Sequence, residues 1–287
     1  MKSRNRPPSN QRTLREVINK AIIIAYREDV TNLVSSLAAE GFEVEVLRAE
    51  YTSEEMNYSK NSKTFISHKK AWEKAAESPG YTLICEADFV PCRGIGDFRV
   101  FWPVENSYAW GYLYQGSPRL LAVVGSERYL RGQAAPLVSY VINPTVALLM
   151  LKYFEREKET YDLRTYFTFD SHLQYHVMGL GGEAFIPRYH YGEHGGMPNA
   201  EHGSLGSLAR GGRHRADNLM GSLHFLPPYA EGSYLSFLRT RLGGHLLGLA
   251  RLATGRWISK TDVYRLRPLD VTRMYLIGLR RLISLPL

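Results

Sequence analysis

Two acidic residues at the end of an apolar run are the part of this sequence best suited to chemistry. Residues 81–88 read Tyr-Thr-Leu-Ile-Cys-Glu-Ala-Asp between turn-forming residues, a pattern typical of a buried strand. Glu86 and Asp88 are two positions apart, so an extended backbone would point both carboxylates to the same face. Such a pair at the carboxyl edge of an α/β sheet suits Mg²⁺ or Mn²⁺ that holds a diphosphate. The alternative is a strand that ends in an acidic surface turn.

The elements before this pair are expected to form the sheet that positions it. Residues 21–26 and 42–47 read as strands, and a helix capped by Asp29 and ended by Gly41 lies between them. A second helix is predicted over residues 64–77, before the acidic strand. This alternation of strands and helices predicts a parallel α/β sheet, with the acidic pair at the end of its third strand.

The elements after the pair are less regular. A strand is expected over residues 138–142, followed by a helix with a proline in its first turn. Asp170 is placed to cap a short helix over residues 171–178, and residues 183–186 read as a final strand. The chain then enters a loop rich in glycine and histidine over residues 189–212, and its length suggests a functional role.

Length and composition place the chain among globular proteins with a full hydrophobic core. It has 287 residues, including 19 Tyr, 11 Phe and 4 Trp, which is unlike a disordered chain. Its two cysteines, Cys85 and Cys92, lack the spacing of a disulfide framework or a zinc site. No apolar run is long enough for a transmembrane helix, and no apolar signal core follows the basic N-terminus. The sequence therefore predicts a cytoplasmic protein with a polar, disordered lead-in at residues 1–12.

Positive charge is concentrated toward the C-terminal end. Residues 233–287 hold ten Lys or Arg against two acids, whereas the preceding residues hold 26 of each kind. Leucines at helical spacing among these basic residues predict an amphipathic helical tail over residues 231–287, behind an α/β domain at 13–230. We expect the tail to hold the protein on the inner face of an anionic membrane. The alternatives are a solvated basic cap and a nucleic-acid patch; because no nucleic-acid motif accompanies it, no nucleic-acid partner is expected.

Several segments occur in an order found in a known family. In chain order they are the strand ending Tyr26-Arg27, the helix with Ser67-His68 and Trp72, and the strand ending Glu86-Ala87-Asp88. The order resembles glycosyltransferase family 25, the lipopolysaccharide- and collagen-modifying transferases, in which a Ser-His…Trp helix precedes a strand ending Glu-Asp-Asp. Residues 139–147 are similar to that family's tyrosine-plus-helix segment, and Asp170 to its later aspartate. The resemblance covers residues 21–178, and Ala87 departs from it by replacing the middle acid.

The resemblance implies a GT-A-like, Rossmann-like α/β fold in which helices flank a mostly parallel sheet. It implies transfer of a hexose from a nucleotide diphosphate sugar, with a UDP-sugar as the expected donor, to a glycan or lipid-linked acceptor. It also implies inversion at the sugar and a Mn²⁺ or Mg²⁺ cofactor. A divalent ion of this kind lowers the barrier because it neutralises charge on the departing diphosphate.

The resemblance also implies roles for the candidate residues. Asp88 is the expected direct metal ligand, and Glu86 is expected to reach the ribose, a metal-bound water or the metal itself. His194 would complete the metal shell from the glycine-rich loop, as a late histidine does in several transferases of this fold. Tyr26 and Arg27, at the end of the first strand, are expected to contact the nucleotide, although Arg27 is equally typical of an exposed surface.

Two further residues have alternative roles. His68 and Trp72 are four apart on one helical face; they either support the sheet from the core, or His68 lies in the nucleotide site and orients Asp88 or the diphosphate. Asp170 is the expected catalytic base that takes the proton of the acceptor hydroxyl. Capping of the following helix is its alternative role, and the two roles are compatible.

Two other functions stay open on the sequence. A nucleotidyltransferase would use a similar sheet and metal, but it normally has a glycine-rich, basic loop after the first strand. Tyr26-Arg27-Glu28-Asp29 does not form such a loop. A non-catalytic nucleotide-sugar-binding or scaffold protein would keep the fold without turnover, which the missing middle acid allows.

Overall fold

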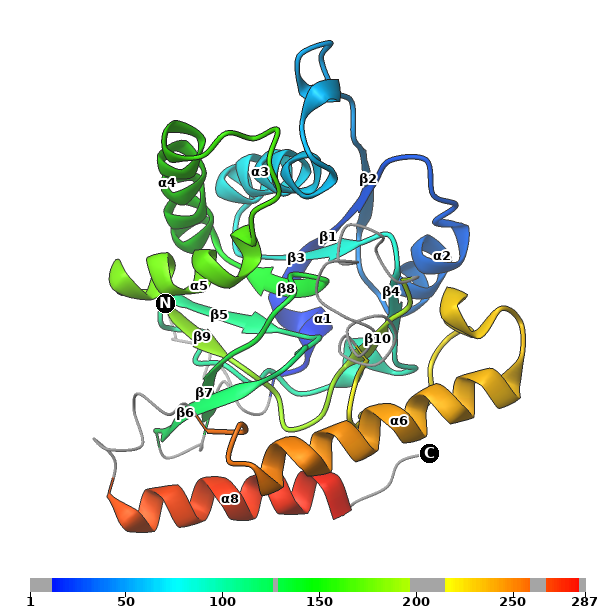
Figure 1. Ribbon diagram of the computed structural model, residues 1–287, viewed down its shortest axis with the longest axis vertical. Coiled ribbons are helices and arrows are strands. Elements are labelled where there is room, and N and C mark those ends of the chain that lie inside the picture. Colours follow the sequence, from blue (N-terminus) through cyan, green and yellow to red (C-terminus); the bar gives the residue numbers. More distant parts are fainter. Residues whose placement is uncertain (1–11, 126–128, 197–214, 259–266, 284–287) are drawn as a thin grey trace, which may run out of the picture.

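A single eight-stranded sheet runs through the protein, with helices on both faces (Figure 1). The computed structural model describes residues 12–125, 129–196, 215–258 and 267–283, so the predicted lead-in lies almost entirely outside the described residues. The strands of the large sheet are β1 (Ile18–Ala25), β2 (Val44–Arg48), β3 (Tyr81–Glu86), β5 (Ala109–Tyr112), β6 (Arg119–Val124), β7 (Tyr129–Gln133), β8 (Ser139–Ile142) and β9 (Glu183–Phe185). A small second sheet pairs β4 (Phe89–Pro91) with β10 (Gly192–His194).

The strand order of the large sheet is β2-β1-β3-β8-β5-β9-β7-β6. The pairings make β7 and β8 run opposite to the other six strands, so the sheet is mostly parallel in direction. Helices that connect parallel strands must cross over a face of the sheet, which gives the Rossmann-like layering expected from the sequence. The helices are α1 (Leu14–Val17), α2 (Thr31–Ala39), α3 (Lys60–Glu77), α4 (Pro144–Thr160), α5 (Phe169–Gly179), α6 (Tyr234–Ala253) and α8 (Pro268–Ile283).

The predicted strand–helix alternation is confirmed in the first part of the chain. Strands β2, β1 and β3 are parallel neighbours, joined through α2 and α3. Alternate residues of β1 face different layers: Ile22 and Ile24 pack in the core beneath α3 and α4, whereas Ala21 and Ile23 pack beneath α1 and α2. Burial on both faces explains why the strand reads as a continuous apolar run.

Helix starts follow local capping. The Asn143 side chain accepts from the Val146 N–H at 3.0 Å, and Pro144 occupies the first turn of α4, as predicted. Helix α3 begins at Lys60, four residues before the predicted start, because the Ser59 hydroxyl accepts from the Ser62 N–H. Helix α5 begins at Phe169, so Asp170 lies inside its first turn instead of at the cap.

The C-terminal helices α6 and α8 lie side by side along one edge of the molecule, below β6 and β7 in Figure 1. The Leu120 N–H of β6 donates to the Trp257 carbonyl at 2.7 Å. The buried side chains of Leu252, Trp257, Met274 and Leu282 belong to the same core as β1 and α3. The predicted helical tail is therefore also part of the domain's core. Within the described residues, no helix combines the length and apolar character needed to cross a membrane.

Candidate metal and nucleotide site

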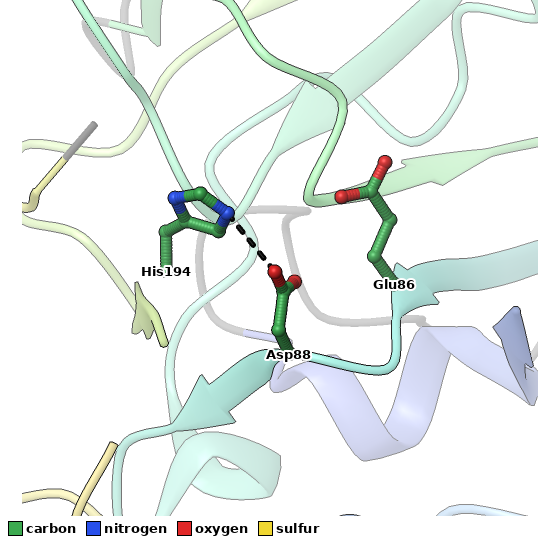
Figure 2. Close-up of side chains that lie close together, drawn as sticks. All are labelled: Glu86, Asp88 and His194. Atoms are coloured by element: carbon green, nitrogen blue, oxygen red, sulfur yellow. Dashed lines mark ion pairs between the residues drawn. The ribbon is translucent and has the colours of Figure 1, made fainter. Parts of the chain in front are cut away.

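A tight turn, and not strand alternation, brings Glu86 and Asp88 together. Strand β3 ends at Glu86, and Ala87 and Asp88 form the turn into β4. The two carboxylates were expected on one face of an extended strand, but only Glu86 belongs to the strand and Asp88 lies in the turn. Both side chains nevertheless point to the same space at the carboxyl edge of the sheet (Figure 2).

Pairing of two distant segments adds a histidine to this space. Strand β10 runs antiparallel to β4 with His194 opposite Phe89, and the Gly195 N–H donates to the Asp88 carbonyl at 2.8 Å. His194 Nε2 consequently lies 3.1 Å from Asp88 Oδ2. One ligand atom each from Glu86, Asp88 and His194 lies within 4.8 Å of the others (Figure 2), so the three predicted metal ligands are close together.

The surroundings fit a divalent cation. Asp88 Oδ1 is buried and has no hydrogen-bond partner among the described residues, which leaves one carboxylate oxygen available to a ligand. A Cβ on Gly196 would collide with the Asp88 carboxylate, so only glycine leaves this space open. Two carboxylates and one imidazole are donors that suit Mn²⁺, and the carboxylates alone suit Mg²⁺.

Asp88 and His194 form an ion pair at the site. Burial alone would raise the pKa of the Asp88 carboxyl, but the neighbouring His194 offsets this and holds that pKa below its usual value. Burial likewise opposes the charged imidazole, yet Asp88 raises the pKa of His194 above its usual value. The pair shows that this pocket already favours positive charge beside Asp88.

A buried chain of hydrogen bonds holds Glu86 from behind. The Trp72 Nε1–H donates to the Tyr140 oxygen at 2.6 Å, and His68 Nδ1 lies 2.9 Å from the same oxygen. The Tyr140 oxygen accepts from the indole N–H, which can only donate, and its own O–H can donate to His68 Nδ1. His68 then carries its proton on Nε2, which lies 3.1 Å from Glu86 Oε1. His68 is fully buried and lies behind the Glu86 carboxylate, the place of a residue that orients a ligand-binding group.

Removing the Tyr140 hydroxyl, which joins these hydrogen bonds, should destabilise the protein. Tyr140→Phe leaves the buried Trp72 N–H and His68 Nδ1 without their shared partner, and is expected to lower the free energy of unfolding by about 1–3 kcal/mol. Urea denaturation measures this. Tyr114→Phe is the matched control, because the Tyr114 hydroxyl is buried without a hydrogen-bond partner among the described residues. Equal stability of the two variants would contradict a stabilising role for the hydrogen bonds centred on Tyr140.

Tyr26 and Arg27 lie at the same sheet edge. In the β1–β3 register Ile24 is opposite Glu86, so the chain leaves both strands side by side. The Arg27 guanidinium lies 4.8 Å from the centroid of the Tyr26 ring. The Tyr26 ring is 5.6 Å from that of Tyr51, a residue the sequence did not single out. Together they offer one aromatic pair and one cation beside the carboxylates.

Asp170 faces the same region from α5. Its Oδ1 accepts from the Ser171 N–H at 2.8 Å. Burial raises the pKa of the Asp170 carboxyl; the Ser171 amide partly offsets this, and the nearby charge of Glu86 raises the pKa further. The ring of the preceding residue, Phe169, lies 5.8 Å from that of His68, which ties the start of α5 to the Glu86 side of the site.

Glu193, Arg215 and Arg241, none of which the sequence assigned to the site, hold the β10 segment in place. Buried Glu193 accepts from the N–H groups of His194 and Ala216, and its other oxygen pairs with Arg241 of α6 at 2.9 Å. Arg215 donates to the carbonyls of His194 and Gly196, at 2.6 and 2.8 Å. Glu193 and Arg215 carry no periodicity that would mark them, whereas Arg241 belongs to the predicted basic tail, whose pattern did not show that this arginine turns inward.

Fold and site together define a Rossmann-like α/β protein with an acidic cluster at the carboxyl edge of its sheet. No family model matches this sequence, and no curated protein matches it. Among solved structures it is similar to a CTP:phosphocholine cytidylyltransferase from Streptococcus pneumoniae, with 12% identity and a TM-score of 0.35. The match covers 60% of this chain and 90% of that one. A likeness this distant carries no argument about activity.

Proposed function

We propose that this protein is a divalent-metal-dependent glycosyltransferase that uses a nucleotide diphosphate sugar. The observation that carries the proposal is the convergence of Glu86, Asp88 and His194 within 4.8 Å at the carboxyl edge of β1 and β3. In open α/β sheets ligands bind at this edge. Bound there, Mn²⁺ or Mg²⁺ would neutralise the charge that develops on the leaving diphosphate.

The donor side of the proposed site has separate parts for the nucleotide and the diphosphate. In this proposal Tyr26 and Tyr51 would stack on the base, and Arg27 would pair with a phosphate or the ribose; the aromatic pair and the adjacent guanidinium support these roles. Asp88 and His194 would hold the cation, and Glu86, fixed by His68, would complete its shell or accept from the ribose. This arrangement would recognise a UDP-sugar by its uracil, ribose and diphosphate together.

The acceptor side would be served by Asp170. In the transfer step the acceptor oxygen forms a bond to the anomeric carbon while the bond from that carbon to the diphosphate oxygen breaks. The diphosphate leaves with the electron pair, and the proton of the acceptor hydroxyl passes to the Asp170 carboxylate. A raised pKa makes this carboxylate a better base. Attack from the side opposite the diphosphate would invert the sugar, and the acceptor class we propose is a glycan or lipid-linked sugar.

A nucleotidyltransferase is less well supported. After β1 the Tyr26 N–H donates to Glu28 at 2.6 Å, and Asp29 accepts from the Thr31 N–H at 2.9 Å. The carboxylates of Glu28 and Asp29 each hold an N–H group of this turn, and their negative charge opposes the binding of a triphosphate here.

Calorimetry and a hydrolysis assay test the proposal. The protein, with Mn²⁺, is titrated with UDP-, GDP- and CMP-sugars and with UTP and CTP, and release of free sugar is then followed. We expect one class of nucleotide sugar to bind and to be slowly hydrolysed, and Asp170→Asn to bind it equally but to hydrolyse it about 100-fold or more slowly. Pyrophosphate release from a triphosphate with a sugar phosphate would overturn the proposal in favour of nucleotidyl transfer. Binding without turnover would favour a scaffold protein.

A further inference from the structure

Helix α6 turns its large apolar side chains toward solvent. Leu235, Leu242 and Leu246 are 72%, 61% and 55% exposed. Their spacing of seven and four residues places them on one side of the helix. The buried residues of α6, Gly244, Gly248 and Leu252, lie on the opposite side. An apolar stripe of this kind normally faces a protein core.

Helix α8 repeats this arrangement. Leu269, Leu276 and Ile283 recur every seven residues and are 61%, 47% and 67% exposed. Met274, Gly278, Arg281 and Leu282 form its buried side. Helices α6 and α8 pack against each other along one edge of the molecule (Figure 1), so the two apolar stripes lie on neighbouring helices.

Glycines form much of the buried side of α6 and α8, in place of larger apolar residues. A Cβ on Gly244 would press on the Ala216 carbonyl, and one on Gly248 would press on Asp217 and on Leu282 of α8. A Cβ on Gly278 would meet Leu252 and Trp257. The helices therefore sit close to the domain and to each other through small residues, and their larger apolar side chains are left on the outside.

The described arginines from 239 to 281 differ in their surroundings. Arg241 and Arg281 point inward and pair with the buried carboxylates of Glu193 and Asp217. Arg251 is half-buried and donates to the Ser117 hydroxyl at 2.7 Å. The exposed ones are Arg239, Arg256, Arg267, Arg273 and Arg280, of which Arg273 lies 3.5 Å from Asp270. Asp270 is the only acid among the described residues from 234 to 283. The outer side is therefore both apolar and strongly positive.

We propose that this α6–α8 face, defined by the exposed leucines, Ile283 and the exposed arginines named above, docks on an anionic phospholipid surface. Leucines at helical spacing enter the boundary between headgroups and acyl chains, and flanking arginines pair with lipid phosphates. A second copy of the chain is a poor occupant, because self-association would set arginine against arginine. Docking here does not depend on the chemistry proposed for the acidic cluster, and it would bring the protein to a lipid-linked acceptor.

Vesicle flotation of the full-length protein tests the docking. We expect flotation with vesicles containing phosphatidylglycerol and little with pure phosphatidylcholine. Arg239→Glu with Arg273→Glu, and separately Leu242→Ser with Leu246→Ser, should each reduce the bound fraction about tenfold or more. Matched controls are Arg164→Glu and Leu148→Ser, which change exposed residues outside these helices and should float like the parent protein.

Three outcomes would overturn the docking proposal. One is equal flotation of the α6–α8 variants and the parent protein, checked for intact folding by circular dichroism. Another is equal binding to neutral and anionic vesicles, which would remove the role of the arginines. The third is a dimer, detected by light scattering, that the leucine substitutions dissociate in protein that binds no vesicles.

Discussion

Replacing Asp88 by asparagine is expected to abolish Mn²⁺ binding while leaving the fold intact. Asparagine has the shape of aspartate and can still accept from His194, but it removes the negative charge at the centre of the cluster. Loss of an outer-shell partner alone costs metal sites 10–100-fold in affinity, so loss of this ligand should cost roughly 100-fold or more. Electron paramagnetic resonance of free Mn²⁺, or calorimetry, measures the affinity directly.

Substitutions of the other two ligands, and of one acid outside the cluster, show whether the loss of Mn²⁺ binding is specific to this site. His194→Gln and Glu86→Gln remove the other two expected ligands and should weaken Mn²⁺ binding as well. Asp97→Asn is the control, because its carboxylate is exposed and pairs with Arg15 away from the cluster. Mn²⁺ affinity in Asp88→Asn equal to that of the parent protein would reject the site. Since the readout is metal binding, this result would be separate from any failure to find the right sugar donor.

Replacing Arg281 by methionine is expected to destabilise the whole domain. The Arg281 side chain is fully buried; it pairs with Asp217, donates to Gln115 Oε1 at 3.0 Å and lies over the Trp257 ring at 5.0 Å. Arg281 offsets the burial of Asp217 and holds the pKa of that carboxyl well below its usual value, and His190 adds to the effect. Removing the guanidinium leaves a buried carboxylate without its cation, which costs about 3–5 kcal/mol.

Thermal unfolding measures this effect, with an expected fall in Tm of roughly 10 °C. Adding Asp217→Asn to Arg281→Met should restore part of the loss, because no unpaired charge then stays in the core. Arg273→Met on the exposed side of the same helix should change stability by less than about 0.5 kcal/mol. An unchanged Tm in Arg281→Met would show that the pair does not support the fold. For the same reason, deletion of residues 233–287 is expected to unfold the protein, so it cannot test membrane binding.

Local sequence patterns were sufficient to predict several of the strands and helices. The apolar runs that became β1 and β3, the Asn143-Pro144 start of α4 and the short strand β9 were all predicted, because each depends on residues close in sequence. The sequence pattern did not predict the bounds of the strands between residues 109 and 133. There glycines and prolines interrupt short strands whose partners come from elsewhere in the chain.

The sequence by itself determined the chemistry available here: carboxylates after an apolar strand, a Ser-His…Trp helix, and a C-terminal region rich in leucine and arginine. Only the tertiary structure decided how these parts meet. It set the turn at Asp88, paired β4 with β10 across about a hundred residues, and placed His68 behind Glu86. It also sent Arg241 and Arg281 inward while other arginines stayed outside. Periodicity shows which face of an element is apolar, but long-range pairing and buried partners decide what that face contacts.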